Sequence, residues 1–430
     1  MNTIIDRLNR YAADRPQEIV YSFYRPEGLL EKRSYAKLRS NAAAIAQWLR
    51  NADMVGKPVL LVYPPGLEFV DAFIGCLAAG IHAIPVVELR GKSGRHGLDP
   101  FQEVVQDSGA WLALTTNEKL ATFQYRSGQR ADLEHIKWIA TDELPPDPKS
   151  HDSIPAPQIN DIAFIQYTSG STSSPSGVEV RHSNLFANLQ LIQQKFGHNK
   201  HSSGVIWLPH FHDMGLIGGI LQPLFAGFPV VLLAPQVAVR DPLTWLRLID
   251  SNQATTSGGP NFIYDLCVEK VTDFEAAELD LSTWDLAFTG AEPVNAATME
   301  RFCDKFAASG FRRTAIYPVY GLAESTLMVT GGEKLTGMIT ENIDGRVCVS
   351  CGSASPEHKI KIVDPISRAP VDRDRSGEIW VSGPSVSSGY LHAKGDKQQV
   401  FGNRLAGDDD GVYVATGDIG VVIHLSLIHI

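Results

Sequence analysis

A hydroxyl-rich stretch follows an apolar run near the middle of the chain. It reads YTSGSTSSPSGVEV over residues 167–180, with five serines, two threonines and two glycines, and it comes directly after the apolar segment IAFIQ. Glycine lets a backbone approach a ligand closely, and hydroxyl and N–H groups donate hydrogen bonds to oxyanions. The stretch is therefore a candidate phosphate cradle, although its composition also fits a flexible surface connection.

The standard nucleotide-binding motifs do not occur in the sequence. A P-loop requires Gly, four residues and then Gly-Lys-Ser/Thr, but Pro175 stands at the position of the second glycine. Neither G-x-G-x-x-G nor G-x-S-x-G is present, which argues against a dinucleotide-binding fold and against an α/β-hydrolase. If the stretch holds phosphates, it does so without the P-loop lysine.

Two short patterns raise the question of a metal site. In HFHDMG, Asp213 directly follows His212 and no third histidine comes next, so the H-x-H-x-D-H pattern of metallo-hydrolases is not met. Cys348 and Cys351 form a C-x-x-C, but RVCVSCG alternates like a strand and no second cysteine pair completes a zinc site. We therefore do not expect either of these two segments to bind a metal.

The composition is that of a globular protein with two or three hydrophobic cores. The 430 residues are 44% hydrophobic and carry a net charge of 38 − 48 = −10, which argues against nucleic acid or an anionic membrane as partner. Five cysteines are too few for a disulfide scaffold, and no apolar run reaches the roughly 20 residues of a membrane span. Ile4, Ile5, Leu8 and Tyr11 have the spacing of an amphipathic helix rather than a signal peptide. We therefore expect a cytoplasmic protein without a transmembrane segment.

The order of apolar and amphipathic segments predicts an α/β fold. VLLVY, the helical LEFVDAFIGCLAAG and IHAIPVV give a βαβ unit with parallel strands. After a proline-rich segment at 143–158, a second series begins with a strand at Ile162–Gln166 and a helix that Ser183 can cap. Near Val347 the pattern changes to short alternating strands. We expect two α/β subdomains with mainly parallel sheets plus a small β-rich subdomain, with bounds at 1–160, 161–346 and 347–424.

The hydroxyl-rich stretch is one of several motifs that occur in a familiar order. It resembles the phosphate-binding signature of adenylate-forming ligases, Y-T-S-G-S-T-x-x-P-K-G-V. Further matches run from about residue 20 to residue 420, and H-D-M-G-L-I-G-G, G-A-E-P-V and Y-G-L-A-E-x-T resemble the fatty acyl-AMP ligase branch of that superfamily. The matching segments are WLPHFHDMGLIGGIL (207–221), GGPNFIYDLC (258–267), LDLSTWDLAFTGAEPV (279–294), YPVYGLAEST (317–326) and VYVATGDIG (412–420).

The resemblance implies a reaction in which a fatty acid carboxylate attacks the α-phosphate of ATP to give an acyl-adenylate and pyrophosphate. It also implies Mg²⁺ and an acyl carrier protein or synthase carrier domain as the acceptor of the acyl group. Thr168, His212 and Glu324 are then expected to be catalytic, with Glu324 as the Mg²⁺ ligand. The expected nucleotide-binding residues are Thr168, Ser169, Gly170, Ser171 and Thr172 for the phosphates, Gly290, Ala291, Glu292, Tyr320 and Gly321 for adenine, and Asp418 for the ribose.

The acyl group is expected to enter beside the segment HFHDMGLIGG. By resemblance, His212 lies at the mouth of the pocket, and Met214, Gly218 and Gly219 line the tunnel behind it. Each methylene group buried there contributes about 0.8 kcal/mol, so a deep tunnel favours medium or long chains.

The sequence departs from the family pattern at three places. Ser176 stands where the loop usually has Lys or Arg, and Ala415 replaces the arginine common before T-G-D. The connection GGEKLTGMITENIDGRVCVSCG is shorter than usual in a region associated with discrimination against coenzyme A. An acyl-coenzyme A ligase and a non-catalytic acyl- or nucleotide-binding module therefore stay open as alternatives.

The end of the chain also differs from the resemblance. Where the family continues into a C-terminal domain, the sequence reads VVIHLSLIHI, and LSLIHI resembles the translation of a sequencing-adaptor end. We expect residues 425–430 to be a non-native tail and the C-terminal domain to be absent.

Overall fold

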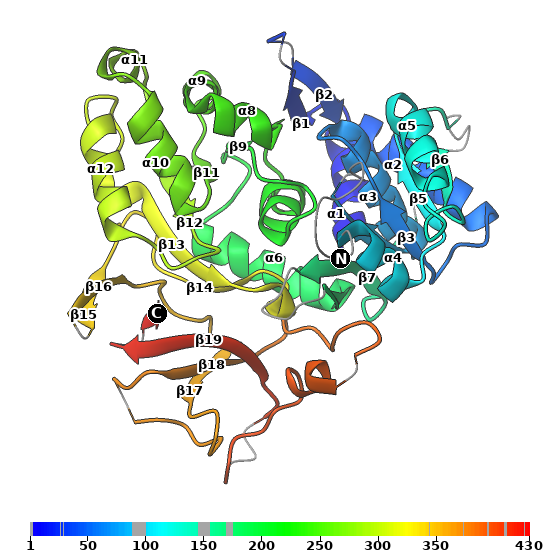
Figure 1. The fold of residues 1–430 in the computed structure, drawn as a ribbon. Helices are drawn as coiled ribbons and strands as arrows, with labels where there is room; N and C mark the ends of the chain where they lie inside the picture. Colours follow the sequence, from blue (N-terminus) through cyan, green and yellow to red (C-terminus); the bar gives the residue numbers. More distant parts are fainter. Residues whose placement is uncertain are drawn as a thin grey trace. The chain divides into compact units, whose positions relative to one another are not determined.

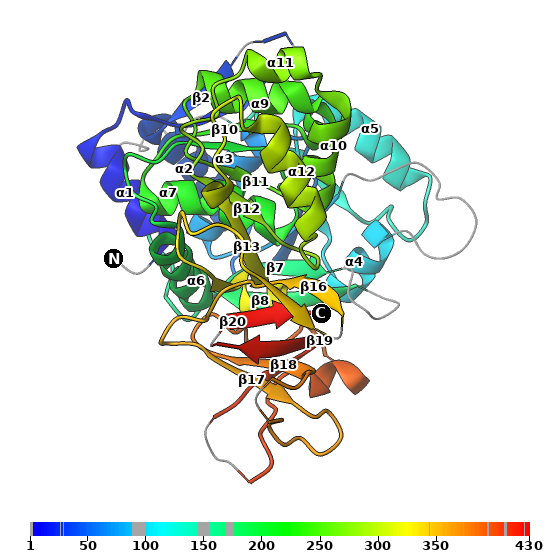
Figure 2. The same cartoon turned by 90° about the vertical axis from the view of Figure 1, so that its left-hand side faces the viewer.

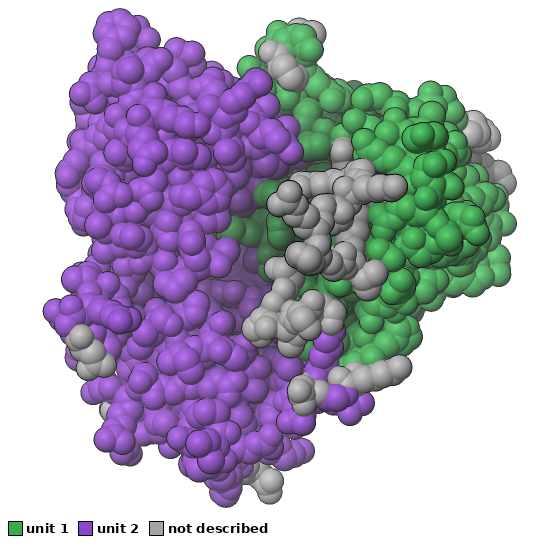
Figure 3. Space-filling model, in the orientation of Figure 1, with its two compact units in different colours: residues 1–186, 209–216, 387–394 green, residues 187–208, 217–386, 395–430 purple. Residues whose placement is uncertain are grey.

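The fold is known from a computed structural model of the chain. It describes residues 3–25, 27–28, 30–87, 100–144, 155–168, 175–343, 345–372, 374–393, 395–407, 411–424 and 426–430. These residues form two compact units, shown in different colours in Figure 3. Unit 1 comprises residues 1–186, 209–216 and 387–394, and unit 2 comprises residues 187–208, 217–386 and 395–430.

Unit 1 is built on a six-stranded sheet with the order β6-β5-β3-β4-β7-β8. The strands β3 and β4 pair in parallel, and the helix α3 connects them, which confirms the predicted βαβ unit. Only β8 runs antiparallel to its neighbour, because a short connection joins it to β7. The strands are β3 (Pro58–Leu61), β4 (His82–Pro85), β5 (Leu112–Thr115), β6 (Lys137–Ala140), β7 (Ile162–Thr168) and β8 (Ser176–Arg181).

The helices of unit 1 cover its sheet with apolar faces. Phe69, Phe73 and Leu77 of α3 are fully buried, and Gly80 ends this helix in the left-handed conformation at φ 74°. The predicted N-terminal helix is confirmed as α1, which buries Ile4, Ile5 and Leu8. The helices are α1 (Ile4–Asp14), α2 (Tyr35–Asn51), α3 (Leu67–Ala79), α4 (Pro100–Ser108) and α5 (Asn117–Gly128), and the strands β1 (Ile19–Tyr24) and β2 (Leu30–Ser34) form an antiparallel hairpin.

Ser183 does not cap the helix that follows β8. The helix α6 spans His182–Phe196, so Ser183 lies inside its first turn, where its N–H donates to the carbonyl of Ile159. The side chain of Asn184 instead accepts a hydrogen bond from the N–H of Arg181 at 3.1 Å. The predicted cap was therefore wrong, because the β8 strand passes directly into the helix without a separate cap residue.

Unit 2 contains a second sheet of mainly parallel strands, in the order β14-β13-β12-β11-β9-β10. Only β14 runs antiparallel to its neighbour, β13. Trp245, Tyr264 and Trp284 pack against one another in the core between sheet and helices. The strands are β9 (Gly204–Ile206), β10 (Val230–Leu233), β11 (Thr256–Gly258), β12 (Leu286–Thr289), β13 (Ile316–Gly321) and β14 (Met328–Gly331). The π-helix η1 (Met214–Leu221) begins in unit 1 and ends in unit 2. The helices of unit 2 are α7 (Gln222–Ala226), α8 (Pro235–Arg240), α9 (Pro242–Ser251), α10 (Asn261–Lys270), α11 (Asp273–Ala277), α12 (Ala296–Phe306) and the 3₁₀ turns η2 (Arg313–Ala315) and η3 (Ala323–Ser325).

The predicted β-rich part is confirmed as a four-stranded antiparallel sheet with the order β17-β18-β19-β20. In Figures 1 and 2 these strands lie together, apart from the helices α9 to α12 of the same unit. The sheet consists of β17 (Lys359–Val363), β18 (Gly377–Ser382), β19 (Val414–Ile423) and β20 (Ser426–His429), and it is accompanied by the hairpin β15 (Thr340–Ile343) and β16 (Arg346–Val349) and the turn η4 (Gly395–Gln399).

All five cysteine thiols are free. Four are buried, and only Cys348, in β16, is partly exposed. In the described part of the chain, no helix is both long enough and apolar enough to cross a bilayer.

Candidate active site

The predicted phosphate loop joins the ends of two hydrogen-bonded strands. β7 ends at Thr168 and β8 begins at Ser176, and these two residues face each other in the antiparallel register. Ser169, Gly170, Ser171 and Thr172 lie outside the residues that the structure describes. Thr168 is partly exposed, whereas Ser176, at the position of the family lysine, is only 5% exposed. The sheet therefore fixes both ends of the loop.

The base of this hairpin is held by the neighbouring tyrosine. The hydroxyl of Tyr167 donates to Oδ2 of Asp107 at 2.6 Å, and burial together with this carboxylate raises the pKa of the phenol. Gly177, opposite Tyr167, leaves space for the ring: an added Cβ would lie 2.9 Å from its Cζ. Tyr167 thus anchors the hairpin to α4.

One hydrogen bond connects β7 to the segment that carries His212. The buried side chain of Gln166 donates through Nε2 to the carbonyl of Phe211 at 2.9 Å. Its neighbour His212 is solvent-exposed, although desolvation by the surrounding protein lowers the pKa of the imidazole. Thr168 and His212 therefore belong to one connected piece of unit 1.

His210, two residues earlier, has a different environment. Its ring packs against Phe69 with centroids 4.2 Å apart, and burial lowers its pKa to about 3, so the imidazole is neutral. Among the residues that the structure describes, no three His, Cys, Asp or Glu side chains form a group suited to a metal. His210 is best described as a core residue beneath the exposed His212.

The segment after His212 forms a π-helix over Met214–Leu221. The N–H of Met214, the first residue of this helix, donates to Oδ1 of Asp213 at 2.7 Å. The two predicted tunnel glycines differ in their surroundings: a Cβ on Gly219 would lie only 2.6 Å from Ile206, whereas one on Gly218 would make ordinary contact with Leu327 at 3.6 Å. π-helical turns occur frequently at functional sites.

In unit 2, the motif G-A-E follows directly after β12. Gly290 is buried, and a Cβ there would approach the Val319 carbonyl oxygen to 2.9 Å. Ala291 has φ 70°, which is uncommon for a residue with a side chain. The Oε1 atom of Glu292 accepts a hydrogen bond from the N–H of Asn261 at 2.9 Å. The motif is thus a turn beside β13 in which Gly290 is buried and Ala291 and Glu292 are exposed.

Tyr320 and Asp418 come together although they are far apart in the sequence. The Tyr320 hydroxyl donates to Oδ2 of Asp418 at 2.7 Å, and burial and this carboxylate raise the pKa of the phenol. The His429 ring lies 5.3 Å from the Tyr320 ring, with its Nε2 3.9 Å from Oδ1 of Asp418. Gly321 follows, and an added Cβ would meet the Leu327 carbonyl oxygen at 1.9 Å.

Glu324 lies on the 3₁₀ turn η3, directly between β13 and β14. Its side chain is partly exposed, while its neighbours Ala323 and Ser325 are buried. A carboxylate in this position can reach solvent or a ligand without leaving its turn.

The predicted residues thus divide between the two units. Thr168, His212 and Met214 belong to unit 1, while the adenine, ribose and Mg²⁺ residues and the two tunnel glycines belong to unit 2. Among them the structure joins Tyr320 to Asp418 by a hydrogen bond, and the joint geometry of the two groups remains a prediction.

Sequence reasoning missed three residues that hold the site together. Gln166 connects the hairpin to the His212 segment, Asn188 hydrogen-bonds to both sides of the turn after Glu324, and Thr326 has φ 70° within that turn. Gln166 and Asn188 act on chain segments distant in sequence, and a threonine gives no signal for a positive φ. Thr326 is the last residue of Y-G-L-A-E-x-T, but this motif does not indicate its backbone conformation, and no pattern marks Gln166 or Asn188.

Comparisons with known proteins identify the family of the chain. The family described as AMP-binding enzyme matches residues 8–391. The medium-chain-fatty-acid–[acyl-carrier-protein] ligase JamA of Moorena producens is 35% identical over 441 residues, covering 97% of this chain and 74% of that protein.

Two solved structures from Legionella pneumophila are similar over the whole of this chain. A fatty acid AMP ligase has a TM-score of 0.91 at 36% identity, with 76% of its own chain covered. A fatty acyl-adenylate ligase in complex with acyl adenylate and pyrophosphate has a TM-score of 0.90 at 36% identity, with 77% covered. The chain therefore belongs to the AMP-binding enzymes, and within them to the fatty acyl-AMP ligases.

Proposed function

We propose that the chain activates a medium- or long-chain fatty acid with ATP to give an acyl-adenylate and pyrophosphate. The observation that carries this proposal is the Tyr320–Asp418 hydrogen bond, which joins the Y-G-L-A-E and T-G-D motifs across 98 residues. A ring beside a carboxylate suits a nucleoside, because the ring can stack on the base and the carboxylate can accept from ribose hydroxyls. The similarity to a ligase bound to acyl adenylate and pyrophosphate supports the same reading.

The proposed reaction is a displacement at phosphorus. A carboxylate oxygen attacks the α-phosphorus of ATP, the bond from that phosphorus to the bridging oxygen of the β-phosphate breaks, and pyrophosphate leaves with the bonding electrons. Two unit charges 4 Å apart repel by ~4 kcal/mol at an effective dielectric near 20, so the site must offset this repulsion. Thr168 and the hairpin are proposed to hold the phosphates, and His212 to orient the carboxylate.

Glu324 fits the role of a Mg²⁺ ligand. It is a partly exposed carboxylate on a short turn, and Mg²⁺ in nucleotide sites is typically bound through one or two carboxylates together with the phosphates. The ion, when bound, would neutralise developing charge on the phosphates. The contribution of this chain would be to hold one carboxylate in place.

The acceptor of the acyl group is proposed to be an acyl carrier protein or the carrier domain of a synthase. JamA is named as a ligase to acyl-carrier protein, and this chain is 35% identical to it. Coenzyme A is the alternative acceptor. Incubation with a fatty acid, ATP and either acceptor, followed by mass spectrometry of the thioester, distinguishes the two.

The first test is fatty-acid-dependent ATP–pyrophosphate exchange. We expect the exchange rate to be higher with dodecanoate than with acetate. Ser176→Lys should increase the rate, because the added cation would face the leaving phosphates. Glu324→Gln should lower the rate by roughly tenfold or more. Ser251→Lys, at an exposed serine on α9, is the matched control for an added lysine. Because Ser176 is buried, the melting temperature of Ser176→Lys is measured alongside.

Three results would count against the proposal. Equal turnover of acetate and dodecanoate contradicts the chain-length preference. ATP binding without exchange in both the original chain and Ser176→Lys favours the non-catalytic binding module, which the serine at position 176 already suggests. Wild-type activity in Glu324→Gln contradicts the role of this carboxylate.

A further inference from the structure

Thr326 has a backbone conformation that a threonine rarely adopts. Its dihedral angles are φ 70° and ψ −60°, and the N–H of Leu327 donates to the carbonyl of Ser325 at 2.8 Å. These features define a γ-turn of the rare, strained hand. A positive φ is a genuine outlier for a β-branched residue, and such outliers persist only where the surrounding structure holds them.

The side chain of Thr326 ties the turn to a distant loop. Thr326 is fully buried, and its hydroxyl donates to the carbonyl of Ser385 at 2.6 Å. The hydroxyl of Ser385 in turn contacts Nε2 of His358 at 2.6 Å, and Nδ1 of His358 contacts the hydroxyl of Ser355 at 2.8 Å. Burial lowers the pKa of His358, so a neutral ring between two hydroxyls forms a fixed anchor.

Asn188, which lies earlier in the sequence than Thr326, binds the same turn. Its side-chain amide donates to the carbonyls of Ser325 at 3.2 Å and Met328 at 2.8 Å, and its Oδ1 accepts from the N–H of Met328 at 3.2 Å. Asn188 is fully buried in α6. The backbone on both sides of Thr326 is therefore fixed by one amide, and Thr326 itself by its hydroxyl.

Glu324 lies two residues before Thr326, and the same hydrogen bonds determine where η3 ends. The N–H of Thr326 donates to the carbonyl of Ala323 at 2.8 Å, which closes η3. If Thr326 relaxed to a negative φ, the chain would leave η3 in another direction and the Glu324 carboxylate would shift with it. The strain at Thr326 is thus coupled to the placement of Glu324.

We propose that Thr326 is a positioning residue that fixes the Glu324 carboxylate for Mg²⁺ and ATP through its hydroxyl bond to the Ser385 carbonyl. The inference deepens the proposed function, on whose assignment of Glu324 it rests. A purely structural role would predict lower stability without any change in Mg²⁺ dependence.

The test compares two variants. Thr326→Val keeps the shape of the side chain but removes the hydroxyl, and Thr326→Ser keeps the hydroxyl. Thr330→Val is the matched control, because Thr330 is equally buried and its hydroxyl has no hydrogen-bond partner among the described residues. The first readout is hydrogen exchange of the amides of residues 322–328 in the full chain. The second is the Mg²⁺ concentration that gives half-maximal ATP–pyrophosphate exchange, with the KM for dodecanoate measured in parallel.

We expect Thr326→Val to lose protection in this segment and to need roughly tenfold more Mg²⁺, with the KM for dodecanoate within about twofold of wild type. Thr326→Ser and Thr330→Val should behave as wild type. If Thr326→Val does not fold, Thr326→Gly replaces it, because glycine adopts φ 70° without strain but cannot bond to Ser385.

Two outcomes overturn the inference: unchanged Mg²⁺ dependence in a folded variant without the hydroxyl, or loss of protection without such a change. Failure of the proposed function gives a different result. If wild type shows no exchange activity, ATP affinity is measured by calorimetry with and without Mg²⁺. If Mg²⁺ raises the ATP affinity of wild type and of Thr326→Ser but not of Thr326→Val, the inference is still supported. If Mg²⁺ does not change the ATP affinity of wild type, the inference is contradicted.

Discussion

At the scale of single residues, the site depends on close backbone approaches that side chains would prevent. The motif Y-G-L-A-E in the sequence indicated an adenine pocket at Tyr320 and Gly321, but only the structure shows why the second residue is glycine. β13 and β14 pair with an irregular register here, and the carbonyl of Leu327 lies against the Cα of Gly321. The glycine therefore serves the turn that carries Glu324.

Gly321→Ala should destabilise the protein by about 3 kcal/mol, because its Cβ would lie 1.9 Å from the carbonyl oxygen of Leu327 and the strands would have to separate. Gly332→Ala is the control one residue after β14, where an added Cβ meets nothing within 4 Å. Urea unfolding of both variants measures the difference. Equal stability of the two would show that β13 and β14 adjust freely.

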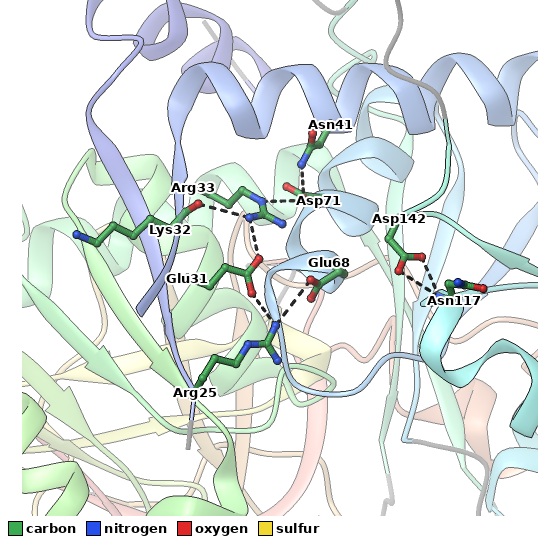
Figure 4. A network of polar contacts seen from close by, with 9 residues as sticks. All are labelled: Arg25, Glu31, Lys32, Arg33, Asn41, Glu68, Asp71, Asn117 and Asp142. Carbon is green, nitrogen blue, oxygen red and sulfur yellow. Dashed lines mark hydrogen bonds and ion pairs between the residues drawn. The ribbon is translucent and has the colours of Figure 1, made fainter. Parts of the chain in front are cut away.

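At the scale of elements, charged and amide side chains join β2 to the helices α2 and α3, as Figure 4 shows. Arg33 donates through Nε to Oδ2 of Asp71 at 3.0 Å, and Asn41 donates to the same oxygen at 2.7 Å. Burial raises the pKa of Asp71 to about 6, although Arg33 and Asn41 lower it and Glu68 adds to the rise. Glu31 is a second partner of Arg33 at 2.8 Å.

This network gives the stability a defined pH dependence. The folded pKa of Asp71 lies above its unfolded value of about 3.9, so between about pH 4 and pH 6 only the folded state holds the proton. Protonation of Asp71 therefore adds to the free energy of unfolding at low pH, and this contribution is lost as the pH rises through about 6. Arg33→Met leaves Asp71 without its cation and should cost about 3–5 kcal/mol at pH 8 but less at pH 5, where Asp71 is protonated.

Urea unfolding of Arg33→Met at pH 5 and pH 8 tests this expectation. Lys37→Met is the control. Lys37 is exposed on α2 and, like Arg33 and Asp71, lines a cavity of about 330 Å³. Its stability should stay within about 0.5 kcal/mol of wild type at both pH values. An equal loss in Arg33→Met at the two pH values would mean that Asp71 does not titrate in this range.

At the scale of the whole molecule, the local periodicity of the sequence predicted most helices and strands, but it could not predict hydrogen bonds between residues far apart in the sequence. The βαβ unit around α3 and the individual strands of the β-rich sheet follow from the local spacing of apolar residues. The bond from Gln166 to Phe211 spans 45 residues, and the one from Thr326 to Ser385 spans 59, so neither leaves a local pattern. Ordered motifs predicted the site residues, whereas the residues that support them became visible only in the structure.

The division of the site residues between two units predicts different footprints for nucleosides and nucleotides. Adenosine should slow amide exchange only around residues 290–292, 320–321 and 418 in unit 2. ATP with Mg²⁺ should also protect the β7–β8 hairpin of unit 1, because only ATP has phosphates for the cradle to bind. Hydrogen exchange with mass spectrometry makes this comparison, and protection of the hairpin by adenosine would contradict the assignment of that loop.

The uneven burial of the five thiols has a practical consequence. Burial raises the pKa of Cys303 to about 11 and of Cys351 to about 12, and it raises those of Cys76 and Cys267 further still. Since a thiolate is the reacting species, these four should resist alkylation near neutral pH, and the partly exposed Cys348 should react alone. A maleimide fluorophore would then mark the β15–β16 hairpin at one position of the unaltered chain, ready for distance measurements by energy transfer.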